Sequence, residues 1–138
     1  MTTKLNPYIS FQNNARQAMQ FYQSVFGGEL TISTFKEFGM SQDPSQDNLV
    51  MHAMLVTGAG QTLMAADTPA GMEYRPGTNF SVSLSGDDEA ELTGYFEKLS
   101  AGGTVTMPLA KQVWGDSFGM CTDPFGVGWM VNIAAVTP

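Results

Sequence analysis

The sequence contains the same arrangement of elements twice, and this repeat limits its fold more than any other feature. Each copy has apolar residues at helical spacing that include an adjacent Phe and Tyr, and each helical pattern ends at a Gly-Gly pair. Repetition within one chain is typical of a duplicated structural unit. The repeated hairpin pattern lies at one offset of 66 positions, with Met54, Gly60 and Met64 returning as Met120, Gly126 and Met130.

Hydrophobic periodicity predicts the elements of each copy. Alternating apolar residues predict strands, and apolar residues three and four positions apart predict helices. In the first copy we expect strands over 5–11, 29–35, 49–57 and 61–66 and a helix over 15–26 that starts after Asn13 and Asn14. In the second we expect strands over 80–85, 104–107, 118–122 and 128–133, a loop or ragged strand over 108–116, and a helix capped by Asp87 or Asp88. The sequence therefore predicts an α+β fold within one domain, 1–138, with βαβββ modules over about 1–67 and 79–138 and a linker over 68–78.

The charge of the chain argues against several kinds of partner. Six basic residues stand against 13 acidic ones, for a formal net charge of −7. The basic residues are scattered, whereas a surface that binds nucleic-acid phosphates or anionic lipids needs clustered Lys and Arg. We therefore expect no nucleic-acid partner and no membrane partner.

Segment composition also bears on location. No apolar run approaches the ~18 residues of a membrane span, and residues 1–12 lack the basic and apolar segments of a secretory signal. Cys121 is the only cysteine, which excludes an intrachain disulfide and a thiolate zinc cluster. We therefore expect a cytoplasmic protein.

Several segments resemble one known group of proteins. They are 7–11 (PYISF), 52–53 (HA), 63–64 (LM) with Asp67, 114–119 (WGDSFG), 123–126 (DPFG) and 129–132 (WMVN). Together with the repeated βαβββ unit, they resemble the vicinal oxygen chelate superfamily, which includes glyoxalase I, extradiol dioxygenases and bleomycin-resistance proteins, and within it the PhnB-like branch. The resemblance implies curled, partly open mixed sheets with the helices on the convex side. It also implies a homodimer, and a pocket whose divalent metal is bound by His and Glu of the first and last strands.

The positions that the resemblance assigns to metal ligands carry other residue types here. A thioether is a poor ligand for Mg²⁺, Mn²⁺, Fe²⁺ or Zn²⁺ in an oxygen and imidazole setting, and the chain has one histidine. We therefore expect no metal and no other cofactor. The alternative is a metal-dependent lyase, isomerase or dioxygenase whose rearranged site uses His52 with Asp116 or Asp67. The positions that the resemblance assigns to metal ligands are Met64 and Met130 in the last strands, and Pro7 or Tyr8 and Phe80 or Ser81 in the first strands.

The residues expected to bind a ligand lie on or beside the predicted strands. Met64, Met130 and Asn132 are expected to share a face, where two flexible apolar side chains and one amide either line a trough or simply fill it. His52 is either a general base or a half-buried, hydrogen-bonded histidine. No residue is assigned a catalytic role. The candidate ligand-binding residues are Tyr8, His52, Met64, Phe80, Trp114, Asp116, Met130 and Asn132.

Trp114 and Asp116 lie in a predicted loop before a strand. An aromatic ring beside a carboxylate suits stacking on a small molecule and hydrogen bonding to it. The alternative is that Trp114 closes one end of the barrel. Both interpretations remain open from the sequence.

Other polar and reactive residues are expected to be structural. Residues 123–126 have the pattern of a β-turn, and Asp67 is expected to have the equivalent role after the first hairpin, where it ends the strand. The acidic residues over 87–91 suit the positive end of a helix, and Cys121 is expected to be a small buried side chain.

These observations favour a protein that binds a small organic molecule in an apolar trough without metal. No Gly-x-Gly turn leads from a parallel strand into a helix, which argues against a methyltransferase that binds S-adenosylmethionine on a doubly wound sheet. A structural or partner-binding role is an alternative, because low charge and edge strands favour self-association.

Overall fold

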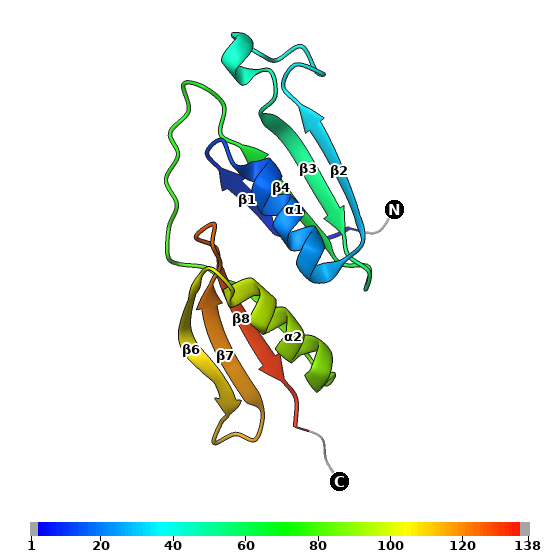
Figure 1. Cartoon of the computed structure of the whole chain (residues 1–138), viewed down its shortest axis with the longest axis vertical. Helices are drawn as coiled ribbons and strands as arrows, with labels where there is room; N and C mark the ends of the chain where they lie inside the picture. Colours follow the sequence, from blue (N-terminus) through cyan, green and yellow to red (C-terminus); the bar gives the residue numbers. More distant parts are fainter. Residues whose placement is uncertain (1–2, 136–138) are drawn as a thin grey trace. The chain divides into compact units, whose positions relative to one another are not determined.

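A computed structural model describes residues 3–135, and these residues form two compact units that divide between Pro76 and Gly77. Each unit has the element order βαβββ and contains one four-stranded mixed sheet with one α-helix packed against it (Figure 1). The predicted α+β class with two βαβββ modules is therefore confirmed. Neither α-helix is long and apolar enough to span a bilayer.

In the first unit the strand order is β1-β4-β3-β2, with β1 parallel to β4 and the other neighbours antiparallel. The prediction that the first strand starts at Leu5 is wrong, because Leu5 is fully exposed and Pro7 has no N–H to donate to a sheet. The elements are β1 (Tyr8–Phe11), α1 (Ala15–Phe26), β2 (Glu29–Thr34), the 3-10 helix η1 (Pro44–Gln46), β3 (Val50–Val56) and β4 (Thr62–Asp67).

In the second unit the strand order is β5-β8-β7-β6, again with one parallel pair, β5 and β8. Residues 108–116 were expected to form a loop or ragged strand, and the first four of them extend β6 to Lys111. The pairing of β6 with β7 shifts register twice. Pro108 is tolerated there because β6 is an edge strand. The elements are β5 (Val82–Gly86), α2 (Glu89–Ser100), β6 (Thr104–Lys111), β7 (Ser117–Thr122) and β8 (Gly128–Ile133).

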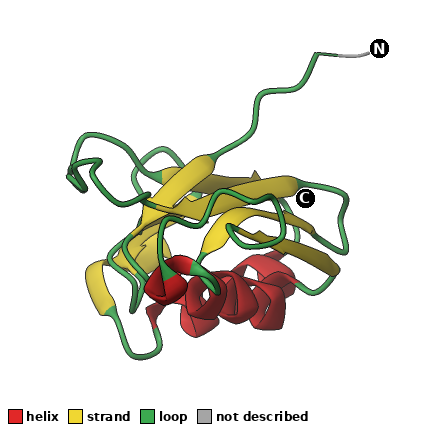
Figure 2. Ribbon diagram, turned by 90° about the horizontal axis from the view of Figure 1, so that it is seen from above, coloured by secondary structure: helices red, strands yellow, loops and turns green. Residues whose placement is uncertain are grey.

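Each sheet has one face covered by its helix and one that the helix leaves uncovered, which we call the open face (Figure 2). Successive strand residues point to opposite faces, and burial alternates accordingly. In β8, Trp129, Val131 and Ile133 are buried, whereas Met130 and Asn132 are half-buried. The prediction that the first three form core and the other two share the opposite face is confirmed.

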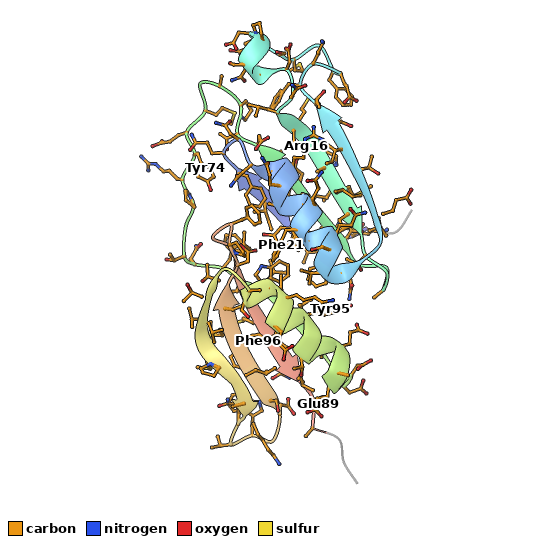
Figure 3. All side chains as sticks on the ribbon, viewed as in Figure 1. Arg16, Phe21, Tyr74, Glu89, Tyr95 and Phe96 are labelled. Atoms are coloured by element: carbon orange, nitrogen blue, oxygen red, sulfur yellow. The ribbon has the colours of Figure 1, made fainter. Side chains whose placement is uncertain are left out.

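The two helices begin differently. Asp88 caps α2 by accepting a hydrogen bond from the Glu91 backbone N–H at 3.0 Å, as predicted. Figure 3 shows Glu89 at one end of α2, with Tyr95 and Phe96 farther along the same helix. Asn14 occupies the N-cap position of α1, but its side chain makes no capping hydrogen bond.

The N-terminus of α1 is instead held by Asp67 from the end of β4. Its carboxylate accepts the backbone N–H of Ala15 at 2.9 Å and that of Val50 at 2.8 Å, and its side chain is buried. Asp67 therefore joins α1, β3 and β4. It ends β4, as predicted, but its carboxylate binds the start of a helix and of a strand and not a turn.

The Gly-Gly pairs have a role beyond ending the helices. A Cβ atom on Gly28 would lie 2.0 Å from the carbonyl oxygen of Val56, and one on Gly103 would lie 2.1 Å from that of Thr122. Such distances are far inside van der Waals contact. The second glycine of each pair therefore lets the chain that leaves the helix pass against the end of a strand.

Candidate functional site

The open face of the first unit carries a row with one residue from each strand. Tyr8 of β1 pairs with Met64 of β4, Met64 pairs with Met54 of β3, and Met54 pairs with Thr31 of β2. Paired residues of neighbouring strands project from the same face. Two methionines therefore lie at the centre of the sheet, flanked by a phenol and a hydroxyl.

Tyr8, at one end of this row, contacts His52. The Tyr8 hydroxyl lies 3.2 Å from His52 Nδ1, and the ring centroids are 5.7 Å apart. His52 is half-buried. Burial also raises the pKa of the Tyr8 hydroxyl. His52 thus has a titratable partner, which sequence reasoning missed because the two residues are 44 positions apart on strands that are not neighbours.

The open face of the second unit repeats the methionine row. Met107 of β6 pairs with Met120 of β7, Met120 with Met130 of β8, and Met130 with Ser83 of β5. The 66-position correspondence of the methionines predicted from the sequence therefore holds in the strand register. In the second unit, the ligand position of the first strand was expected at Phe80 or Ser81. This is wrong, because Ser83 pairs with Met130 as Tyr8 pairs with Met64.

Phe80 lies outside the strand where it was expected. The strand β5 starts at Val82, and the Phe80 side chain is 59% exposed. Its candidate role in ligand binding stays a prediction.

A polar group and an aromatic pair lie beside this second row. Asn132 Nδ2 donates to Asp116 Oδ2 at 3.0 Å, and the Ala135 backbone N–H donates to Asp116 Oδ1 at 2.9 Å. Both bonds favour the carboxylate and lower the pKa of Asp116, the first more than the second. The first bond also orients the amide of Asn132, and Asn132 lies directly opposite Phe118 on the neighbouring strand.

Trp114 lies in the turn between β6 and β7, as expected, and its ring contacts the Phe118 ring edge-on with centroids 6.2 Å apart. The indole is 59% exposed. An exposed ring in this turn and a second ring on β7 thus lie next to an oriented amide on the neighbouring strand β8. Such a group can stack on and hydrogen-bond a small molecule.

Asp123 is structural, as predicted. Its carboxylate accepts the backbone N–H groups of Phe125 and Val127 and the indole N–H of Trp129, at 2.8, 3.1 and 2.8 Å. Thr57 holds the matching position in the first hairpin, where its N–H donates to Gln61 as that of Asp123 donates to Val127.

Cys121 is buried in β7, as expected. Burial, together with the nearby Asp123 carboxylate, raises the pKa of its thiol to about 11. Because the thiolate is the reactive form, we expect native protein to react with iodoacetamide at pH 8 about 100-fold more slowly than a thiol of ordinary pKa. The native rate should rise about tenfold per pH unit toward pH 11. Mass spectrometry of timed samples measures both rates.

A thiol on an exposed turn provides the comparison. A variant with Cys121→Ser and Ala59→Cys places it in the first hairpin, where residue 59 is exposed. Equal labelling rates for this variant and the native protein at pH 8 would contradict the prediction.

The residues at the family's expected metal positions do not fit a divalent cation. The strand register puts Tyr8, Met64, Ser83 and Met130 there, and thioethers and uncharged hydroxyls are poor ligands for such ions. Among residues 3–135, no three His, Cys, Asp or Glu side chains come together in a metal-binding group. A site built from His52 and Asp67 is not formed, because Asp67 is buried on the helix-covered face and engaged by two backbone N–H groups.

Comparison with known proteins identifies the family. Residues 4–131 match the Glyoxalase/Bleomycin resistance protein/Dioxygenase superfamily. The chain belongs to this superfamily. It is 30% identical over 145 aligned residues to the protein YjdN of Escherichia coli (strain K12), with 97% of each chain covered.

Solved structures of similar proteins share the superfamily fold. Protein PA1353 from Pseudomonas aeruginosa is 39% identical, with a TM-score of 0.82 over 98% of this chain and 100% of that one. The PhnB protein from Bacillus cereus is 27% identical, with a TM-score of 0.77 over 96% and 100%. The predicted resemblance to the PhnB-like branch of the superfamily is therefore confirmed.

Proposed function

We propose that each unit of this chain binds a small, largely apolar organic molecule against the methionine row of its own open face, without a resident metal. The observation that carries the proposal is the strand register, which puts methionines at the two central positions of both rows. An unbranched thioether adapts its shape to an apolar guest. The same proposal includes a homodimer, which rests on the family resemblance, and a cytoplasmic location, which rests on the segment composition of the sequence.

The polar groups beside the rows support specific binding over simple apolar packing. Ligand sites combine apolar walls with a few oriented hydrogen-bonding groups. Asn132, held by Asp116, offers its amide oxygen, and Trp114 and Phe118 offer ring surfaces. On this proposal they bind the ligand's polar end and its flat apolar surface, respectively.

Methionine methyl groups provide a direct test. In protein labelled with ¹³C at the methionine methyls, a bound apolar compound should shift the NMR signals of Met54, Met64, Met120 and Met130. The signal of Met19, a buried residue of α1, and that of Met40, in an exposed loop, should stay in place. A library of small apolar and aromatic compounds supplies the probes. The proposal fails if no compound shifts the row signals more than that of Met40.

Substitution at Met130 tests whether the rows make the contact. Met130→Gln keeps the length of the side chain but adds an amide, and we expect at least about a 5-fold loss of affinity because that amide must be desolvated. Met130→Leu keeps the apolar character and should remain within about 3-fold of the wild type. Met40→Gln is the matched control on the surface. Equal affinity of Met130→Gln and Met40→Gln would argue against binding at the row.

A further inference from the structure

We propose that Tyr8 and His52 form a hydrogen-bonding site for the hydroxyl group of an uncharged ligand, a phenol or another alcohol with an apolar body. This inference rests on the proposed function, because the body of the same ligand would lie on Met54 and Met64 beside the pair. It adds the chemical class of the ligand and the residues that recognise it.

The geometry of the pair leaves one donor and one acceptor for a ligand. One proton lies between the Tyr8 oxygen and His52 Nδ1, which are 3.2 Å apart. If Tyr8 supplies that proton, the imidazole Nε2–H remains as donor and a phenol lone pair as acceptor. If His52 supplies it, the phenol O–H remains as donor and Nε2 as acceptor.

A hydroxyl group matches both arrangements, since it donates and accepts at once. A keto oxygen would satisfy the donor alone. Within residues 3–135 neither Tyr8 nor His52 makes another hydrogen bond that would occupy these groups. Tyr8 is 49% exposed, so that the pair is accessible within its own unit.

The charged residues on the strands of the first unit argue against an organic anion. Its four strands carry no Lys or Arg, and their charged carboxylates are Glu29, at the start of β2, and Asp67, on the helix-covered face. A ligand carboxylate at Tyr8 and His52 would therefore find no Lys or Arg side chain on these strands. An uncharged hydroxyl needs none.

The pair occurs in one unit only. In the strand register of the second unit, Ser83 takes the place of Tyr8, and Phe118 lies 66 positions after His52. The duplicated sheets therefore share their methionines but differ in the side chains next to them. We assign recognition of the hydroxyl to the first unit.

Two probes that differ by one hydroxyl test the inference. 4-Propylphenol and propylbenzene are titrated into methionine-labelled protein, and the shifts of Met54 and Met64 give both dissociation constants. We expect the phenol to bind about 3- to 10-fold more tightly, which is the range for one net hydrogen bond. Tyr8→Phe and His52→Phe should each remove this advantage and leave propylbenzene binding within about 2-fold of the wild type.

The control variant is Tyr95→Phe, which deletes a tyrosine hydroxyl that donates to Glu91 on α2. It should keep the full preference for the phenol. If both probes bind and shift the row methionines equally in the wild type, the inference is overturned while the proposed function stands. If the preference survives in Tyr8→Phe and His52→Phe, the hydroxyl binds elsewhere and the inference is also overturned. If neither probe binds, it is overturned as well, and the wider library decides the proposed function.

Discussion

A Gly28→Ala variant is expected to lose about 3–5 kcal/mol of the free energy of unfolding, from a steric clash added to an unfavourable backbone conformation. Gly28 has φ of +99°, and a Cβ there would lie 2.0 Å from the Val56 carbonyl oxygen and 2.7 Å from Thr57 Cα. These are backbone atoms of β3 and its turn, so that no side-chain rotation relieves the clash. Urea unfolding followed by circular dichroism measures the loss.

Gly60→Ala separates the two causes. Gly60 has φ of +89°, but nothing lies within 4 Å of the position that its Cβ would occupy. It should therefore lose only the conformational part, about 1 kcal/mol. Equal losses in Gly28→Ala and Gly60→Ala would show that the chain after α1 does not pass as closely to β3 as the structure has it.

Asp67→Ala is the second large effect, with an expected loss of about 3–5 kcal/mol in the free energy of unfolding. The substitution removes two hydrogen bonds to a charged acceptor, each worth about 1.5–3 kcal/mol. It also leaves the N–H groups of Ala15 and Val50 without this acceptor in the interior. Urea unfolding gives the loss, and hydrogen exchange at these two amides should rise in the same variant.

Asp43→Ala is the matched control, because Asp43 also accepts a backbone N–H, that of Ser45 at the start of η1. Asp43 is exposed, and such a capping contact is worth about 1 kcal/mol or less at the surface. The interpretation of Asp67 as the link between α1, β3 and β4 is refuted if both alanine variants unfold at the same urea concentration.

The order of elements could be predicted from the sequence because it depends on local patterns. The helix over Ala15–Phe26 and the strand over Gly128–Ile133 have the predicted bounds, since hydrophobic spacing and the flanking glycines act within a few residues. Two strands were predicted to start too early, because the apolar alternation continues beyond the residues that the structure assigns to each strand. Leu5 and Phe80 continue apolar alternation, but both are exposed and lie before the strands.

The candidate site was predictable in part. The shared face of Met130 and Asn132 follows from the two-residue period of a strand. The contact of Tyr8 with His52 does not follow, because it requires β4 to lie next to β1 on one side and β3 on the other. The contact of Asp116 with Asn132 likewise depends on how the turn after β6 returns to the end of β8.

By itself the sequence determined the duplicated βαβββ order and the alternation that puts methionines on one face of each sheet, since both are periodic properties of the chain. The tertiary structure alone decided which polar groups meet. It brought Tyr8 to His52 across an intervening strand and Asp67 to the start of a helix 52 positions away. The physical reason is that hydrogen bonds form between groups a few ångströms apart, and strand order, which no local pattern encodes, decides which groups those are.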